Sequence, residues 1–204
     1  MNKVTSVEKG DPMYEKLSKL AETFCDENTI KTIVVKGEDG RKSDEVPFVE
    51  KYGMYFYIAW DTGDMLVYSS VFNEDEFSKA IVNTENAARI FPLSSLPEGG
   101  ISPVKLEDLE PTDESNEIYC VSNEKIGNGA GIILCDGYMK KLHEKFGDFY
   151  LIPSSVHEVM ISPKSNGIGK EYLNAVLKGA NDSLDQSVVI SYNVLTFDGG
   201  KLHV

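Results

Sequence analysis

The chain has 204 residues, of which 41% are hydrophobic and 26% are charged, and its net charge is −13. Such a length can bury a sizeable core without disulfides or metals, and no apolar run approaches the roughly 20 residues that cross a bilayer, so we expect no membrane insertion. Nucleic-acid binders need a basic surface and arginine forks, and the sequence contains only Arg41 and Arg89, so we expect no direct nucleic-acid binding.

The first 71 residues predict one helix and several strands. Apolar residues at helical spacing indicate a helix from about Pro12 to Cys25. Residues 29–37 are typical of a strand, and residues 37–47 of an exposed loop. The strongest hairpin signal lies at residues 54–71, where two aromatic and β-branched runs flank the turn residues 61–64.

A second helix is expected in the segment 73–90. Asn73 and Glu76 have the spacing of a capping box, in which each satisfies backbone groups at the start of the helix. The pattern continues to residue 90. The side chains expected to face the core are Phe77, Ala80, Ile81, Ala88 and Ile90.

An acidic segment, residues 97–117, separates the two halves of the chain. It holds seven acids, one lysine, three prolines and the pair Gly99–Gly100. This composition predicts a surface connector that makes at most one short turn, with Leu106 and Leu109 touching a lobe. We therefore divide the chain into an N-terminal lobe of residues 1–96, the connector 97–117 and a C-terminal lobe of residues 118–204.

The second half of the chain predicts strands interleaved with two helices. A glycine-rich turn at residues 127–131 is expected to lead into a strand, and Asp136 to cap the helix that follows. Another helix contains the apolar residues 172–177 and ends at Gly179. Further strands are expected at residues 118–123, 148–153, 155–162 and 187–197. The fold class predicted is α+β, with mixed or antiparallel sheets and a few packing helices.

The predicted strand 155–162 contains the candidate catalytic residues Ser155, His157 and Glu158. Because side chains alternate along a strand, Ser155 and His157 would share one face and Glu158 would point to the other. One interpretation is a hydrolase-like site, with a distant acid such as Asp136 or Glu144 completing a triad. The other is a buried histidine that is hydrogen-bonded within a sheet.

No cofactor or metal site is predicted. The glycine-rich turn has a strand expected after it, whereas a phosphate loop is followed by a helix N-terminus. His143, Glu144, His157 and Glu158 do not have the spacing of a zinc site.

The cysteines predict a reducing compartment. Cys25, Cys120 and Cys135 are an odd, scattered set without a C-x-x-C pair. No apolar segment follows the start of the chain, so no secretion signal is expected. Together these features favour a cytoplasmic protein with reduced thiols.

A longer pattern marks the second half of the chain. It consists of Asn128–Gly129–Ala130, then Gly137, then the string Pro153 to Val159, and the ending at residues 189–202. In this pattern, residues 118–204 resemble the bacterial family catalogued as domain of unknown function 5688, found mainly in Gram-positive gut anaerobes. The first 96 residues do not resemble it. The resemblance implies a bacterial, cytoplasmic protein and brings no known activity.

Three functions follow from these observations. The leading hypothesis is a non-catalytic interaction or regulatory protein with a protein partner, because no complete catalytic or cofactor pattern is present. The first alternative is a hydrolase-like enzyme that uses Ser155 and His157. The second is an acidic inhibitor from a mobile element that mimics nucleic acid. A deep polar pocket around His157 would favour the enzyme over the interaction protein.

Overall fold

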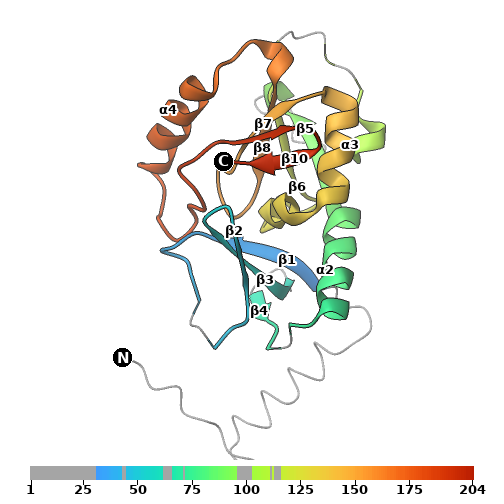
Figure 1. Cartoon of the computed structure of the whole chain (residues 1–204), viewed down its shortest axis with the longest axis vertical. Helices are drawn as coiled ribbons and strands as arrows, with labels where there is room; N and C mark the ends of the chain where they lie inside the picture. Colours follow the sequence, from blue (N-terminus) through green and yellow to red (C-terminus); the bar gives the residue numbers. More distant parts are fainter. Residues whose placement is uncertain are drawn as a thin grey trace, which may run out of the picture.

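The computed structural model shows an α+β fold of antiparallel sheets and a few helices, as the sequence predicts (Figure 1). The predicted helix Pro12–Cys25 lies outside the described residues. Within them, no helix is long and apolar enough to cross a bilayer. The structure describes residues 31–42, 45–61, 66–70, 72–95, 103–110, 112 and 116–204.

The smaller sheet has four strands arranged around β3 (Met54–Asp61). β1 (Lys31–Lys36) lies along one edge of β3, and both β2 (Val49–Lys51) and β4 (Leu66–Tyr68) pair antiparallel with β3. The β3–β4 pair confirms the hairpin that the aromatic runs predict. β2 and β3 are joined by the two-residue turn Tyr52–Gly53.

The larger sheet has six antiparallel strands in the order β10-β9-β7-β8-β6-β5. The strand that precedes the acidic connector pairs with the strand that follows it, so the connector links two adjacent strands of this sheet. The division into lobes at residues 96 and 118 stays a prediction. The strands are β5 (Ala88–Pro92), β6 (Tyr119–Asn123), β7 (Phe149–Ile152), β8 (Val159–Pro163), β9 (Leu195–Asp198) and β10 (Lys201–His203).

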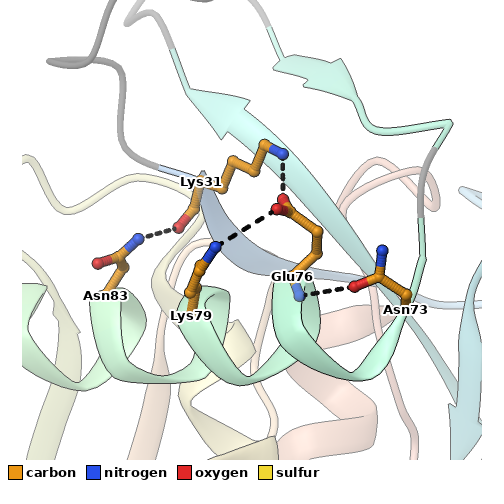
Figure 2. A network of polar contacts seen from close by, with 5 residues as sticks. All are labelled: Lys31, Asn73, Glu76, Lys79 and Asn83. Atoms are coloured by element: carbon orange, nitrogen blue, oxygen red, sulfur yellow. Dashed lines mark hydrogen bonds and ion pairs between the residues drawn. The ribbon is translucent and has the colours of Figure 1, made fainter.

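Helix α2 (Glu74–Ala87) begins at the predicted cap. The Asn73 side chain accepts a hydrogen bond from the backbone N–H of Glu76 at 2.9 Å. Figure 2 shows that the same turn attaches the helix to β1, because the Glu76 carboxylate pairs with the Lys31 ammonium. Further along the helix, Asn83 donates to the Lys31 carbonyl at 2.9 Å.

The end of α2 differs from the sequence prediction. The helix stops at Ala87, and Ala88 and Ile90 belong to β5 instead of the helix. Both side chains are buried, so the apolar pattern marks the core correctly but not the element. The physical reason is that the backbone from residue 88 finds ladder partners in β6.

One apolar cluster joins the two sheets within the described residues. It runs from Ile33 and Phe56 in the smaller sheet to Val121, Leu151 and Phe197 in the larger one. Between the sheets lies η3 (Gly129–Leu134), a 3-10 helix whose six residues are all buried.

The prediction of a strand after the glycine-rich turn is therefore wrong. Residues 129–134 are apolar because they are buried on every side, and the same pattern is typical of a buried strand. A Cβ on Gly131 would lie 1.9 Å from the carbonyl oxygen of Ile33. The glycine is needed there because two backbones touch.

Two later helices pack on the larger sheet. α3 (Asp136–Phe146) buries Tyr138, Met139 and Leu142. Its cap is Cys135 instead of the expected Asp136, which is the first helical residue. α4 (Lys170–Asn181) runs past Gly179. It continues because the buried Asn181 amide donates to the Ser191 carbonyl at 2.9 Å.

Two further predictions concern the closing strand and the connector. The closing strand, expected from residue 187, begins only at Leu195. In the connector, the predicted short turn is present as η2 (Leu106–Asp108), and both Leu106 and Leu109 are buried. The Lys145 ammonium on α3 fixes this turn by donating to the carbonyls of Leu106 and Leu109 at 3.1 and 2.8 Å.

Candidate functional site

The residues Ser154 to Glu158 form a turn that precedes β8, not part of a strand. The prediction that side chains alternate between faces from Ser155 onward is therefore wrong. Instead the turn folds back on itself. The hydroxyls of Ser155 and Ser154 both donate to Oε1 of Glu158, at 2.8 and 3.1 Å. Glu158 thus accepts from both serines, and the two hydroxyls satisfy one carboxylate oxygen.

The ring of His157 points to a different partner. Its Nδ1 accepts a hydrogen bond from the backbone N–H of Asn128 at 3.3 Å. The backbone N–H of His157 donates to Oγ of Ser155 at 3.1 Å. Ser155 and His157 are therefore neighbours, but through the backbone of His157. In the described part of the chain, no hydrogen bond joins the His157 ring to the expected acids Asp136 or Glu144.

The backbone of this turn connects three parts of the fold. The His157 carbonyl accepts from the Gly129 N–H at 2.9 Å and from the Ser122 hydroxyl on β6 at 2.6 Å. The Val156 carbonyl accepts from Ala130 at 3.3 Å, and the Val156 N–H donates to Val188 at 2.9 Å. The turn thus holds η3, the sheet and the segment that leads to β9 in one arrangement.

The space beside the turn is too small for a substrate. A cavity of about 20 Å³ is bordered by Ser122, Asn128 and Gly129, together with residues of β1 and α2. Roughly 10 to 15 Å³ of such space is enough for one water molecule. This cavity therefore has room for a single water, whereas small-molecule sites measure several hundred Å³.

The nearby thiols are also poorly suited to chemistry. Burial raises the pKa of Cys120 to about 12, and the negative charge of Glu158 adds to the effect. Burial likewise raises the pKa of Cys135. Since the thiolate is the nucleophile, both cysteines are inert near neutral pH.

The described residues contain no group of three or more His, Cys, Asp or Glu side chains arranged to hold a metal. Two of the residues considered for zinc have other partners. His143 Nε2 lies 2.9 Å from Asp148 Oδ1, and its ring packs against Phe197. His157 is held by Asn128.

A larger hollow lies elsewhere, where sequence reasoning placed no site. It has a volume of about 220 Å³ and is bordered by three segments that meet only in the folded chain. We call it the tyrosine groove, after the tyrosines of its second and third walls. Its walls are the turn Gly37–Asp39, the turn Tyr52–Gly53 and residues 186 and 189–193.

Tyr52 has an unusual backbone in this groove. Tyr52 and Gly53 have φ angles of 57° and 73°, so both lie in the left-handed region. Two-residue hairpin turns of this kind favour Asn-Gly or Gly-Gly, because a side chain at positive φ is strained. A tyrosine at the first position costs stability, and such strain is concentrated at functional sites.

The opposite wall carries Tyr192. Its side chain is 42% exposed, and its hydroxyl donates to Oε1 of Gln186 at 2.7 Å. This wall is anchored twice, by Val188 to the Ser154–Glu158 turn and by Ser191 to α4. The Ser154–Glu158 turn, which contains the candidate catalytic residues, therefore supports one wall of the tyrosine groove.

The charge of the tyrosine groove is acidic. Glu38 and Asp39 line it, and both are exposed, while its lining includes no lysine or arginine. The Glu38 carboxylate also accepts a hydrogen bond from the Tyr55 hydroxyl at 2.5 Å, which raises the pKa of that phenol. The lining thus combines aromatic rings with carboxylates.

A family model described as a family of unknown function (DUF5688) matches residues 64–199. The match confirms the resemblance seen in the second half of the chain, and it extends further toward the N-terminus, to include α2, β5 and the connector. It covers the wall of the groove at residues 186–193, but not the turns at residues 37–39 and 52–53. No curated protein and no solved structure matches the chain.

Proposed function

The chain belongs to the family of unknown function DUF5688, and we propose that it is a non-catalytic interaction protein whose tyrosine groove receives a basic side chain of a partner protein. The observation that carries the proposal is the groove itself. It is the larger of the two hollows described above, at about 220 Å³ against about 20 Å³. That space suits one long side chain and the backbone around it.

The chemistry of the lining favours a cation. A Lys or Arg side chain packed against an aromatic face is stabilised by the ring quadrupole, and this gain increases when the cation is desolvated. Tyr192 supplies such a ring, whereas the Tyr52 ring already has the Lys51 ammonium 4.9 Å from its centroid. Glu38 and Asp39 supply carboxylates for a charge-assisted hydrogen bond. The net charge of −13 also attracts a basic partner over a longer range.

The hydrogen bonds at Ser155 favour a non-catalytic role. The hydrolase hypothesis needs the Ser155 hydroxyl to donate to the His157 ring as its base, whereas here it donates to Oε1 of Glu158, which also accepts from Ser154. The His157 ring, the base of the hydrolase hypothesis, is occupied by Asn128. The polar atoms of the Ser154–Glu158 turn therefore act as internal supports for the fold.

The proposal is tested by NMR titration of the full chain with acetyl-arginine-methylamide. Acetyl-norleucine-methylamide, which has a comparable stem and no charge, is the control. We expect shift changes at residues 37–39, 52–53 and 186–193 with the arginine probe and much smaller changes with the norleucine probe. Equal responses to both probes, or responses gathered around His157 instead, would contradict the proposal.

A further inference from the structure

Helix α4 exposes an apolar face to solvent. Tyr172 and Val176 are 66% and 51% exposed, and both are large hydrophobic side chains. Ala175 and Gly179 are exposed beside them. In Figure 1 the helix lies at the margin of the molecule, at the upper left of the view. The face that points away from the core is therefore open to a second molecule.

The spacing of these residues makes one continuous stripe. Positions 172, 175, 176 and 179 are related as i, i+3, i+4 and i+7, which places them on the same side of a helix. The opposite side is the one that packs inward, since Leu173, Leu177 and Asn181 are buried. A surface helix normally directs polar side chains to water. α4 is thus apolar on both its inner and its outer face.

We propose that this outer face packs against the same face of a second copy of the chain, with the two α4 helices antiparallel. A two-fold axis makes a self-complementary interface from one surface. If the axis passes between residues 175 and 176, Tyr172 faces Gly179 of the partner subunit. Ala175 then faces Val176 of the partner subunit. Each large side chain meets a small one, so the helices can approach closely.

The charges beside the stripe favour this orientation. Glu171 and Lys178 are both exposed and lie seven residues apart, so they lie on one edge of the helix. When two identical helices pack antiparallel, the same edges meet. Glu171 then lies near Lys178 of the partner subunit, and the pair forms twice. In a parallel two-fold pair opposite edges meet, so Glu171 would not face Lys178 of the partner subunit and neither ion pair would form.

The area of contact predicts a weak dimer. α4 has 12 residues, which corresponds to about 18 Å of helix. A contact of this length is at the small end of specific interfaces, where association is transient. The exposed ion pairs add little affinity, so their main effect is to select the antiparallel arrangement.

The test is sedimentation velocity of the full chain over a range from low to high micromolar concentration. We expect the mass to rise toward that of a dimer as the concentration increases, and Val176→Glu to remain a monomer throughout. Glu171→Lys alone and Lys178→Glu alone should each weaken association several-fold. The double variant Glu171→Lys/Lys178→Glu should restore it, because the pair is re-formed with the charges exchanged.

The matched controls are Lys141→Glu and Glu144→Lys on the exposed side of α3. They change the net charge by the same amounts and should leave association unchanged. Circular dichroism checks that every variant is folded. A wild-type chain that stays monomeric at all concentrations, or a double variant as weak as the single ones, would overturn the proposal.

Discussion

The backbone N–H of Asn128 donates a hydrogen bond to Nδ1 of His157 at 3.3 Å. A neutral imidazole that accepts at Nδ1 carries its proton on Nε2 and has no second acceptor. The ring in this tautomer cannot take a proton from Ser155. The bond therefore assigns His157 to the support of the 128–130 loop, and this assignment leads to the first prediction.

Replacing His157 with alanine should lower the free energy of unfolding by about 1 kcal/mol, because the Asn128 N–H loses its acceptor. Urea unfolding of the full chain measures the change. His203→Ala is a suitable control, since this histidine is exposed near the end of the chain. If His157→Ala were as stable as the wild type, the supporting role would be wrong and a functional site at the ring would gain weight.

Two glycines should respond in opposite ways to alanine. Gly131→Ala is expected to cost about 3 kcal/mol, because the new Cβ would lie 1.9 Å from the Ile33 carbonyl oxygen. Gly179→Ala should stabilise the chain by up to about 1 kcal/mol, since the site is open and lies in a helix. Thermal unfolding at low protein concentration measures both changes without a contribution from association. A tolerated Gly131→Ala would show that η3 does not press on β1.

The buried thiols should be unreactive in the folded chain. Burial raises the pKa of Cys120 to about 12 and also raises the pKa of Cys135, so at neutral pH almost no thiolate is present to react. We expect the Cys25→Ser variant to be labelled by a maleimide only after denaturant is added. Mass spectrometry counts the labels. Rapid labelling of the native variant would mean that one of these cysteines is accessible.

The whole chain should unfold in one transition. The main apolar cluster extends across both sheets, and β5 pairs with β6 across the connector. The smaller clusters around Tyr57 and around Leu173 each lie within one proposed lobe, but most of the described core is shared between the lobes. Calorimetry of the intact chain tests this expectation. A Glu-specific protease should cut first in residues 97–117, where Glu107 and Glu110 are exposed. Two separate transitions would contradict the shared core, and an earlier cut elsewhere would contradict the exposed connector.

Local signals in the sequence predict much of the fold. The helix N-cap at Asn73 and the aromatic hairpin after Met54 are recognisable because their determinants lie within a few residues. The 3-10 helix Gly129–Leu134 is not predictable in this way. Its apolar run indicates only that it is buried, and its backbone is fixed by contacts with β1 and the 154–158 turn.

The tyrosine groove could not be predicted from the sequence for a related reason. Its walls at Tyr52 and Tyr192 are far apart along the chain and meet only through the packing of two sheets. One local signal was present, since Tyr52–Gly53 lies between two strands at a position that favours Asn-Gly. The polar residues from Ser154 to Glu158 are typical of a catalytic cluster in the sequence, yet their hydroxyls and carboxylate are paired with one another.

Selection of a random peptide library on the full chain tests the proposed function most directly. We expect the enriched peptides to share a lysine or arginine, and to lose most of their affinity for the double variant Glu38→Gln/Asp39→Asn and for Tyr192→Ala. Their affinity for Glu171→Gln, which removes an exposed carboxylate on α4, should be unchanged. Enriched peptides without a basic residue, or peptides that bind the groove variants as well as the wild type, would contradict the account.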